Sequence, residues 1–198
     1  MLNRLRNQLE PLINRTAHFV ASSGISPNQL SLLGFTFSIV AGIMYALSSQ
    51  ATSNGSYLIV QIAGIILLIA GLFDLLDGAV ARLTYKSSKR GAYVDSILDK
   101  VAEVFVFICI YLGNHSSAIW CLIALSLSLL VSYTRARAES LDVSLIGIGI
   151  GERAERLLIL ALVGMIPLDG SIQVAVIIVC LVAGITLIQR MNTVIRSL

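Results

Sequence analysis

Four aspartates in an apolar part of the chain are the residues best suited to chemistry. Asp74 and Asp77 are three residues apart and Asp95 and Asp99 are four apart, so on helices each pair shares a face. A short basic loop, 83–90, separates the pairs, so the two helices must run antiparallel and the pairs can converge. Four carboxylates that close would repel one another unless cations neutralised them. Hard ions such as Mg²⁺ or Mn²⁺ prefer such oxygen ligands, so the spacing predicts a metal centre.

Two divalent ions held in this way can clamp a pyrophosphate and activate a nucleophile. Small residues near the aspartates support this interpretation, because Gly78 leaves room for a ligand against the backbone and Arg82, one turn on, can reach its phosphate. The alternative is that the aspartates only form ion pairs with the nearby basic residues, Arg82, Lys89, Arg90 and Lys100. That alternative does not explain why all four acids are aspartate or why small residues surround them.

The composition indicates that membrane helices position these residues. The chain has 198 residues, of which 57% are hydrophobic and 13% charged, which is too apolar for an ordinary soluble domain. A helix needs roughly 20 apolar residues to cross a bilayer. Six stretches approach that length, namely 29–48, 57–81, 92–113, 116–135, 154–168 and 171–189. The fifth is the weakest, because its uncharged part is short. We therefore expect an all-α integral membrane protein with six transmembrane helices.

The start of the chain predicts a further helix of another kind. Apolar residues recur at helical spacing within residues 1–22, with arginines between them, which is typical of an amphipathic helix on the membrane surface. Ser26, Pro27 and Gln29 have the pattern of a helix start with a capping box, at the first span. With no repeat or linker, we expect one domain over 1–198, composed of a surface helix (1–22) and a six-helix bundle (23–198).

Basic residues predict the orientation in the membrane. All 14 lysines and arginines fall in the N-terminal segment, in one alternate set of loops and at the C-terminus, whereas the loops 49–56, 113–117 and 167–170 have none. Lys and Arg mark the cytoplasmic side. Both termini and the aspartate site are therefore expected in the cytoplasm, in a multi-pass protein of the cell membrane.

The aspartates belong to a longer pattern that resembles the signature of the CDP-alcohol phosphotransferase family, Asp74-x2-Asp77-Gly78-x2-Ala81-Arg82-x8-Gly91-x3-Asp95-x3-Asp99. The resemblance implies six transmembrane helices plus a juxtamembrane helix, a homodimer, and two divalent cations, Mg²⁺ or Mn²⁺. It also implies a CDP-lipid substrate, either CDP-diacylglycerol or CDP-archaeol. The implied metal ligands are Asp74, Asp77 and Asp95, and Asp99 would be the general base and a further ligand. The implied CDP-binding residues are Asn28, Asp77, Gly78, Ala81, Arg82 and Gly91.

A group of arginines at the cytoplasmic ends of the last three spans bears on the acceptor alcohol: Arg135, Arg137, Arg153, Arg156 and Arg190. Guanidinium groups bind phosphate oxygens in a fork, so the group favours an anionic acceptor over simple anchoring at the membrane. Arg153 and Arg156 share a helix face, whereas Arg135 and Arg137 point to nearly opposite sides. The stretches 132–139 and 151–156 resemble the phosphatidylinositol phosphate synthase and archaetidylinositol phosphate synthase branch, which implies inositol 1-phosphate as acceptor. Glycerol 3-phosphate is the main alternative.

Other classes of function fit less well. An ion-coupled transporter would need polar residues deep in its spans or broken helices. Here the acids stay near one surface, except Glu103, one turn beyond Asp99, which is either a partner of the site or part of an ion path. A structural scaffold does not explain the aspartate spacing. Nothing in the chain indicates a nucleic-acid partner.

Overall fold

All regular elements in the described part of the chain are α-helices. The computed structural model describes residues 2–50, 53–84, 88–145 and 147–198, and their side chains except those of 2–10, 12, 53 and 54. The helices are α1 (Leu2–Ser22), α2 (Pro27–Ser48), α3 (Ser53–Leu83), α4 (Lys89–Leu112), α5 (Ala118–Glu139), α6 (Arg153–Gly164) and α7 (Ser171–Ser197).

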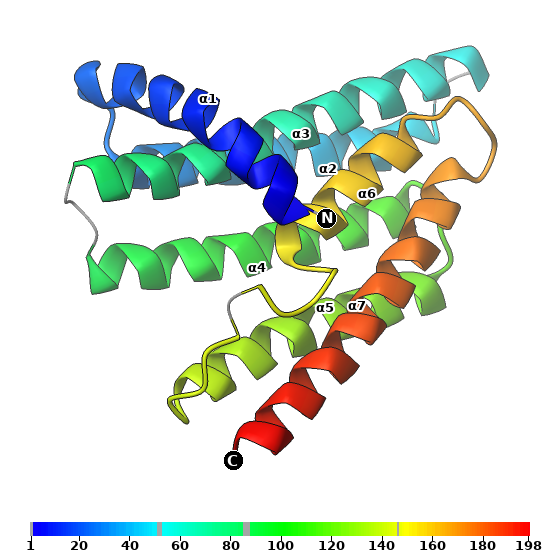
Figure 1. The fold of residues 1–198 in the computed structure, drawn as a ribbon. Coiled ribbons are helices and arrows are strands. Elements are labelled where there is room, and N and C mark those ends of the chain that lie inside the picture. The colour runs from blue at the N-terminus through cyan, green and yellow to red at the C-terminus, as the bar shows by residue number, and fades with distance from the viewer. Residues whose placement is uncertain (1, 51–52, 85–87, 146) are drawn as a thin grey trace.

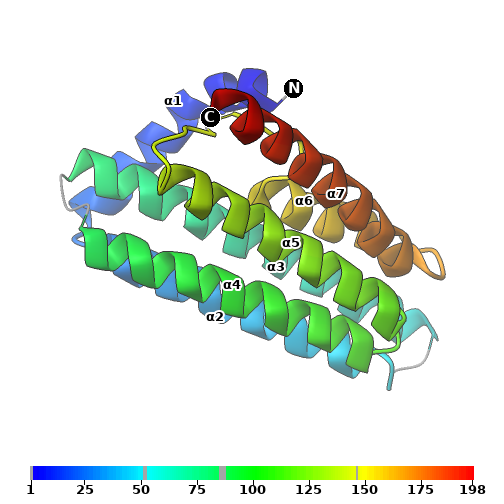
Figure 2. The same ribbon diagram turned by 90° about the horizontal axis from the view of Figure 1, so that it is seen from below.

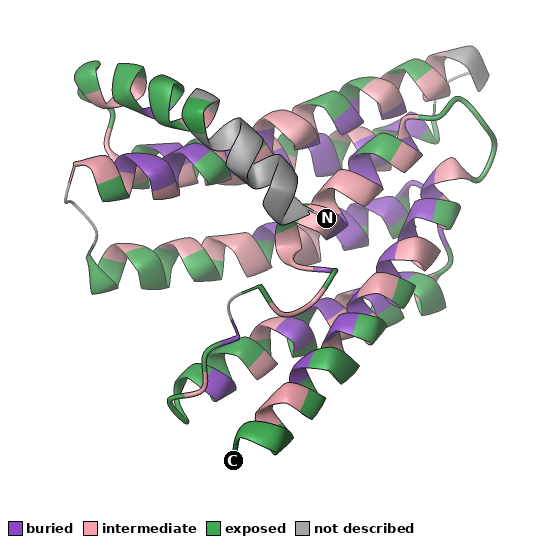
Figure 3. Ribbon diagram, viewed as in Figure 1, coloured by how far each residue is buried: buried purple, intermediate pink, exposed green. Residues whose placement is uncertain are grey.

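From α2 to α7, with the short α6 included, each helix runs opposite to the one before it (Figures 1 and 2). α2 packs between α3 and α4, α5 packs on α7, and the short α6 contacts both α3 and α7. Small residues such as Ala41, Ala63, Ala124 and Ala175 are fully buried, which lets the helices approach closely around Tyr45. Exposed residues follow the outer faces of the helices (Figure 3), and many of them are large and apolar, such as Leu58, Leu122 and Leu181. This distribution is expected of a bundle whose outer faces contact lipid.

The predicted start of the first span is confirmed. Ser26 is the N-cap of α2, and its side chain accepts a hydrogen bond from the Gln29 backbone N–H. In turn, the Gln29 side-chain Oε1 accepts from the Ser26 N–H at 2.8 Å. Pro27 occupies the first helical position. Ser88 caps α4 in a similar way, because its Oγ accepts from the Gly91 N–H at 2.9 Å. Both caps lie at the end of the bundle where the aspartates gather.

Four of the described helices are long and apolar enough to cross a membrane: α2, α3 from Gly55, α5 and α7. α4 has 24 residues but includes Asp95, Asp99, Lys100 and Glu103. α6 has only 12 residues, so it spans about 18 Å, less than the roughly 30 Å of a bilayer core. It ends at Gly164, before the turn that contains Pro167, and the apolar stretch expected over 154–168 is therefore only partly helical.

Residues 2–22 form a helix, α1, which packs against α3. Ala17 is fully buried there, and Ile13, Val20 and Ala21 contact a cluster that includes Leu76 and Val80 of α3. Phe19 is 72% exposed on another side of the helix. The leucines at 2, 5, 9 and 12 lie outside the described side chains. That α1 lies on a membrane surface stays a prediction.

Candidate active site

Three of the four predicted aspartates form one cluster. Asp74 near the end of α3 and Asp95 and Asp99 near the start of α4 each offer a carboxylate oxygen, and these oxygens lie within 4.8 Å of one another. The antiparallel course of α3 and α4 brings them together, as the spacing predicted. All three are half-buried. An oxygen-only set of this size fits a hard divalent ion, so the residues present suit the metal chemistry that the sequence implies.

Asp77 lies beside this cluster in a more enclosed position. It is 7% exposed, and its Oδ2 accepts from Ser31 Oγ of α2 at 2.7 Å. Asp77 and Asp95 line a common cavity. Ser31 was not anticipated from the sequence. It lies four residues after Pro27, the first residue of α2. This position points to Asp77 only once α2 is known to pack beside α3.

The cavity beside Asp77 has a volume of about 160 Å³ and lies between the N-termini of α2 and α4 and the end of α3. Its lining includes most of the residues that the sequence assigned to CDP binding: Asn28, Asp77, Gly78, Ala81 and Gly91. Arg82 is exposed, and its Nη1 lies 3.5 Å from where a Cβ on Gly78 would be. At Gly91 a Cβ would meet Asn28 Oδ1 at 3.1 Å. Without a Cβ, Gly78 and Gly91 therefore leave their backbone accessible beside polar side chains.

A larger cavity of about 610 Å³ lies on another side of the aspartates. Asp95 and Asp99 line it together with four of the five predicted arginines: Arg135, Arg153, Arg156 and Arg190. Arg137 is not among its lining residues; it is exposed, and its Nη1 donates to Ser140 Oγ at 3.3 Å. This division agrees with the opposite directions expected of Arg135 and Arg137. Glu139 and Glu152, which the sequence did not single out, line the cavity as well.

Two of these arginines are buried and held by several partners. Arg156 is 3% exposed; it donates to Glu103 Oε1 through Nε and Nη2 at 3.0 and 2.8 Å, and to the Gly151 carbonyl at 2.7 Å. Lys100 approaches the other oxygen of Glu103 at 3.4 Å. Of the two roles that the sequence left open for Glu103, this pairing fits a partner of the site, and its carboxylate is neutralised by neighbours on α4 and α6.

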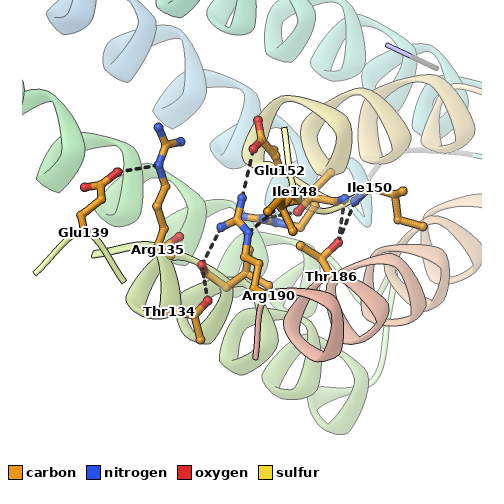
Figure 4. Close-up of polar contacts among 12 residues, drawn as sticks. Thr134, Arg135, Glu139, Ile148, Ile150, Glu152, Thr186 and Arg190 are labelled. Carbon is orange, nitrogen blue, oxygen red and sulfur yellow. Dashed lines mark hydrogen bonds and ion pairs between the residues drawn. The ribbon is translucent and has the colours of Figure 1, made fainter. Parts of the chain in front are cut away.

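Arg190 of α7 is 2% exposed and joins three segments (Figure 4). It donates to the Ile148 carbonyl at 3.0 Å, to the Val131 carbonyl at 2.8 Å and to Glu152 Oε1 at 3.0 Å. Arg135, in contrast, is half exposed and pairs with Glu139 at 3.1 Å. Arg156 and Arg190 therefore have fixed positions, whereas Arg135 is free to adapt.

The loop before α6 is positioned by Thr186 of α7. Its hydroxyl accepts from the N–H groups of Ile150 at 3.1 Å and Gly151 at 2.8 Å (Figure 4). Gly149 has φ +114°, and a Cβ there would lie 2.4 Å from Thr186 Cγ2. The loop must therefore contain glycine where it crosses α7. In the sequence, the alternation of Gly147, Gly149 and Gly151 just before Arg153 is the signal of this close crossing.

Arg153, the first residue of α6, contacts the acidic cluster itself. Its Nη1 lies 2.8 Å from Asp74 Oδ1 and 2.6 Å from Asp99 Oδ1. The arginines and the aspartates were predicted as two separate sites. In the structure the two groups are adjacent. A phosphate bound by the arginines would lie next to the carboxylates.

Comparison with known proteins agrees with the chemistry that these residues suggest. A sequence profile described as CDP-alcohol phosphatidyltransferase matches residues 24–194. Archaetidylinositol phosphate synthase of Pyrococcus horikoshii is 34% identical, covering 96% of this chain and 94% of its own. Phosphatidylinositol phosphate synthase of Streptomyces avermitilis is 32% identical, covering 91% of this chain and 77% of its own.

Solved structures also resemble the fold. The crystal structure of Mycobacterium tuberculosis phosphatidylinositol phosphate synthase with CDP-DAG bound superposes with a TM-score of 0.73 at 25% identity, covering 93% of this chain and 94% of that one. The same enzyme in complex with manganese and citrate has a TM-score of 0.73 at 26% identity, covering 92% and 88%. The profile match, the relatives and the clustered aspartates agree, and the chain belongs to the CDP-alcohol phosphatidyltransferase family of multi-pass membrane enzymes of phospholipid biosynthesis.

Proposed function

We propose that this enzyme transfers the phosphatidyl or archaetidyl group of a CDP-lipid to inositol 1-phosphate and releases CMP. The observation that carries the proposal is the cavity of about 610 Å³ in which Asp95 and Asp99 face four arginines. An acceptor held there by its phosphate would have a hydroxyl near the carboxylates. The relatives are named archaetidylinositol phosphate synthase and phosphatidylinositol phosphate synthase, and these names support the same acceptor.

The aspartates divide into ligands and a base in this proposal. Asp74, Asp77 and Asp95 would hold two divalent cations, Mg²⁺ or Mn²⁺, with Asp99 as an additional ligand. Bound ions would offset the charge of the pyrophosphate and of the departing CMP. Asp99 accepts the proton of the acceptor hydroxyl, whose oxygen attacks the phosphorus nearer the lipid. A new P–O bond forms to the acceptor as the P–O bond to CMP breaks.

The smaller cavity would receive the CDP group. Asn28, Asp77, Gly78, Ala81 and Gly91 line it, and Arg82 stands over Gly78 at its edge. Its position beside Asp77 and Asp95 would place a pyrophosphate next to the ions. The absence of a Cβ at Gly78 and Gly91 is consistent with close approach of a ligand to the backbone.

The acceptor site is proposed from the arginines that line the larger cavity. Arg156 and Arg190 each donate to protein groups from three nitrogens, which fixes the plane of each guanidinium. A guanidinium has five N–H groups in all. They retain N–H groups for a phosphate in a fixed geometry, and Arg135 and Arg153 would complete the site. Arg137, which the sequence included, lies outside the cavity, and we propose that its role is at the membrane interface.

Glycerol 3-phosphate is a second candidate acceptor because its phosphate would bind the same arginines. Glu139 and Glu152 on the cavity wall favour the inositol ring, since carboxylates accept hydrogen bonds from hydroxyls and the ring offers several. A transporter is disfavoured because Glu103 is paired with Lys100 and Arg156 rather than aligned along a path.

We further propose that α4 and α6 complete six spans, with the turn after Gly164 extending the short α6. The chain would then be one domain (1–198), with the N-terminal segment 1–22, which includes α1, at the membrane surface and a bundle over 23–198. The distribution of basic residues supports a cytoplasmic location for both termini and for the active site. A homodimer is proposed from the family resemblance.

The test is CMP release by the purified protein with Mg²⁺ or Mn²⁺, using CDP-diacylglycerol and CDP-archaeol in parallel. Inositol 1-phosphate, glycerol 3-phosphate and serine are offered as separate acceptors. Release with inositol 1-phosphate alone supports the proposal. Release with glycerol 3-phosphate alone keeps the aspartate chemistry and replaces the acceptor. The absence of release with every acceptor contradicts the proposed function.

A further inference from the structure

Arg153 joins two of the clustered carboxylates through one nitrogen. Nη1 lies 2.8 Å from Asp74 Oδ1 and 2.6 Å from Asp99 Oδ1. The two aspartates come from α3 and α4, and Arg153 comes from α6, so three helices meet at this nitrogen. A positive charge here offsets the repulsion between the carboxylates. Arg153 therefore supplies what a metal ion would also supply.

The guanidinium and a metal ion would need the same oxygens. Asp74 and Asp99 belong, with Asp95, to the group whose ligand atoms lie within 4.8 Å of one another. An ion held by these carboxylates would meet the positive charge of Arg153, whose Nη1 is within 2.8 Å of an oxygen of both Asp74 and Asp99. Charge-assisted hydrogen bonds and metal coordination use the same lone pairs, so the two cations compete.

Arg153 has a second anion within its reach. It lines the cavity of about 610 Å³ with Arg135 and Arg190. Arg156 and Arg190 are tied to backbone carbonyls of Gly151, Ile148 and Val131 and keep their positions. The contacts of Arg153 are to side-chain carboxylates, which a metal ion can take over. Arg153 is thus suited to change partners between the aspartates and an anion in the cavity.

We propose that Arg153 exchanges between Asp74 and Asp99 on one side and the phosphate of the acceptor on the other, and that a divalent ion drives the exchange. This inference rests on the proposed function of the same site. It makes metal and acceptor binding cooperative, because the metal releases Arg153 to the anion and the anion draws Arg153 from the carboxylates. Such coupling is reciprocal. Arg153 is therefore a positioning residue that couples metal binding to acceptor binding.

The test compares Mn²⁺ affinity in the full-length protein by electron paramagnetic resonance of free Mn²⁺. Arg153→Gln and Arg135→Gln each remove one positive charge from the same cavity, but Arg135 pairs with Glu139 instead of with the cluster. We expect Arg153→Gln to bind Mn²⁺ roughly fivefold to thirtyfold more tightly than wild type, since two partly exposed ion pairs no longer compete. Arg135→Gln should stay within about twofold, because charges screened by solvent interact weakly. Equal affinity of the two variants would overturn the exchange.

A second measurement starts from the wild-type protein and uses Arg153→Gln as its control. Sulfate, a tetrahedral dianion like the acceptor phosphate, is added to the wild-type protein during the Mn²⁺ titration. Tighter Mn²⁺ binding with sulfate, which disappears in Arg153→Gln, supports the exchange; unchanged or weaker binding in wild type overturns it. If the wild-type protein binds no Mn²⁺, both the exchange and the proposed metal centre are wrong. If it binds Mn²⁺ but sulfate does not tighten this binding, only the exchange is wrong.

Discussion

Glu103 is the residue whose replacement tests most sharply how the site is supported. Its Oε1 accepts two hydrogen bonds from Arg156, at 3.0 and 2.8 Å, and its Oε2 lies 3.4 Å from Lys100. The Arg156 side chain is 3% exposed and that of Glu103 is 10% exposed, so neither is well hydrated. Glu103→Gln keeps the size of the side chain and leaves two cations without their counter-ion.

The expected cost follows from this burial. Removing one partner of a buried pair costs about 3–5 kcal/mol. The amide oxygen of glutamine can still accept from Arg156, so we expect the lower end, about 3 kcal/mol. For a chain of this length that corresponds to a fall in Tm of roughly 6–12 °C. Glu139→Gln is the matched control, because its pair with Arg135 is 61% and 52% exposed and contributes about 0–1 kcal/mol.

The assay is thermal unfolding of both variants in the same detergent, followed by kinetics at a temperature where both are folded. Arg156 lies one turn from Arg153 and holds the Gly151 carbonyl. Glu103→Gln should therefore raise the KM for the phosphorylated acceptor more than the KM for the CDP-lipid. If the two variants melt within about 2 °C of each other, the buried pair does not stabilise the fold as argued here.

Three further predictions concern the base, the loop and the far end of the bundle. Asp99→Asn should abolish CMP release and retain metal-dependent binding of the CDP-lipid, and near-normal turnover would exclude Asp99 as the base. Thr186→Val leaves the N–H groups of Ile150 and Gly151 without an acceptor and should destabilise the fold by about 2 kcal/mol. The control Thr193→Val removes an exposed hydroxyl and should destabilise the fold by less than about 0.5 kcal/mol. Burial lowers the pKa of His115 below its ordinary value of 6.5, partly offset by its hydrogen bond to the Tyr45 carbonyl. The unfolded chain therefore binds more protons, and this contribution to stability is full above about pH 6.5 and is lost as pH falls through the lowered pKa. Melting curves of wild type and His115→Gln between pH 4 and 8 should differ in this pH dependence, and identical dependence would refute it.

The sequence predicted those features that depend on local pattern. The capping box at Ser26 and the convergence of Asp74, Asp95 and Asp99 follow from short spacings and from one antiparallel turn between helices. The separation of Arg135 from Arg137 follows from helical geometry alone. Such features need no knowledge of how distant helices pack.

Features that depend on contacts between distant segments could not be predicted. Ser31 contacts Asp77 across 46 positions, and Arg153 reaches Asp74 across 79. Nothing in either local pattern specifies these pairs, because they depend on how α2 and α6 pack against α3. The apolar count identified 154–168 as the weakest span but could not place the end of α6, since hydropathy continues past Gly164 into a turn.

The most direct test of the account is whether the acceptor must carry a phosphate. The purified protein is given a CDP-lipid, Mg²⁺ or Mn²⁺, and either inositol 1-phosphate or free inositol, and the kcat/KM for CMP release is compared. The arginines of the large cavity predict turnover with inositol 1-phosphate and at least about a hundredfold lower kcat/KM with inositol, since charge-assisted bonds to the phosphate would be lost. Equal use of the two alcohols would contradict the assignment of that cavity to the acceptor phosphate.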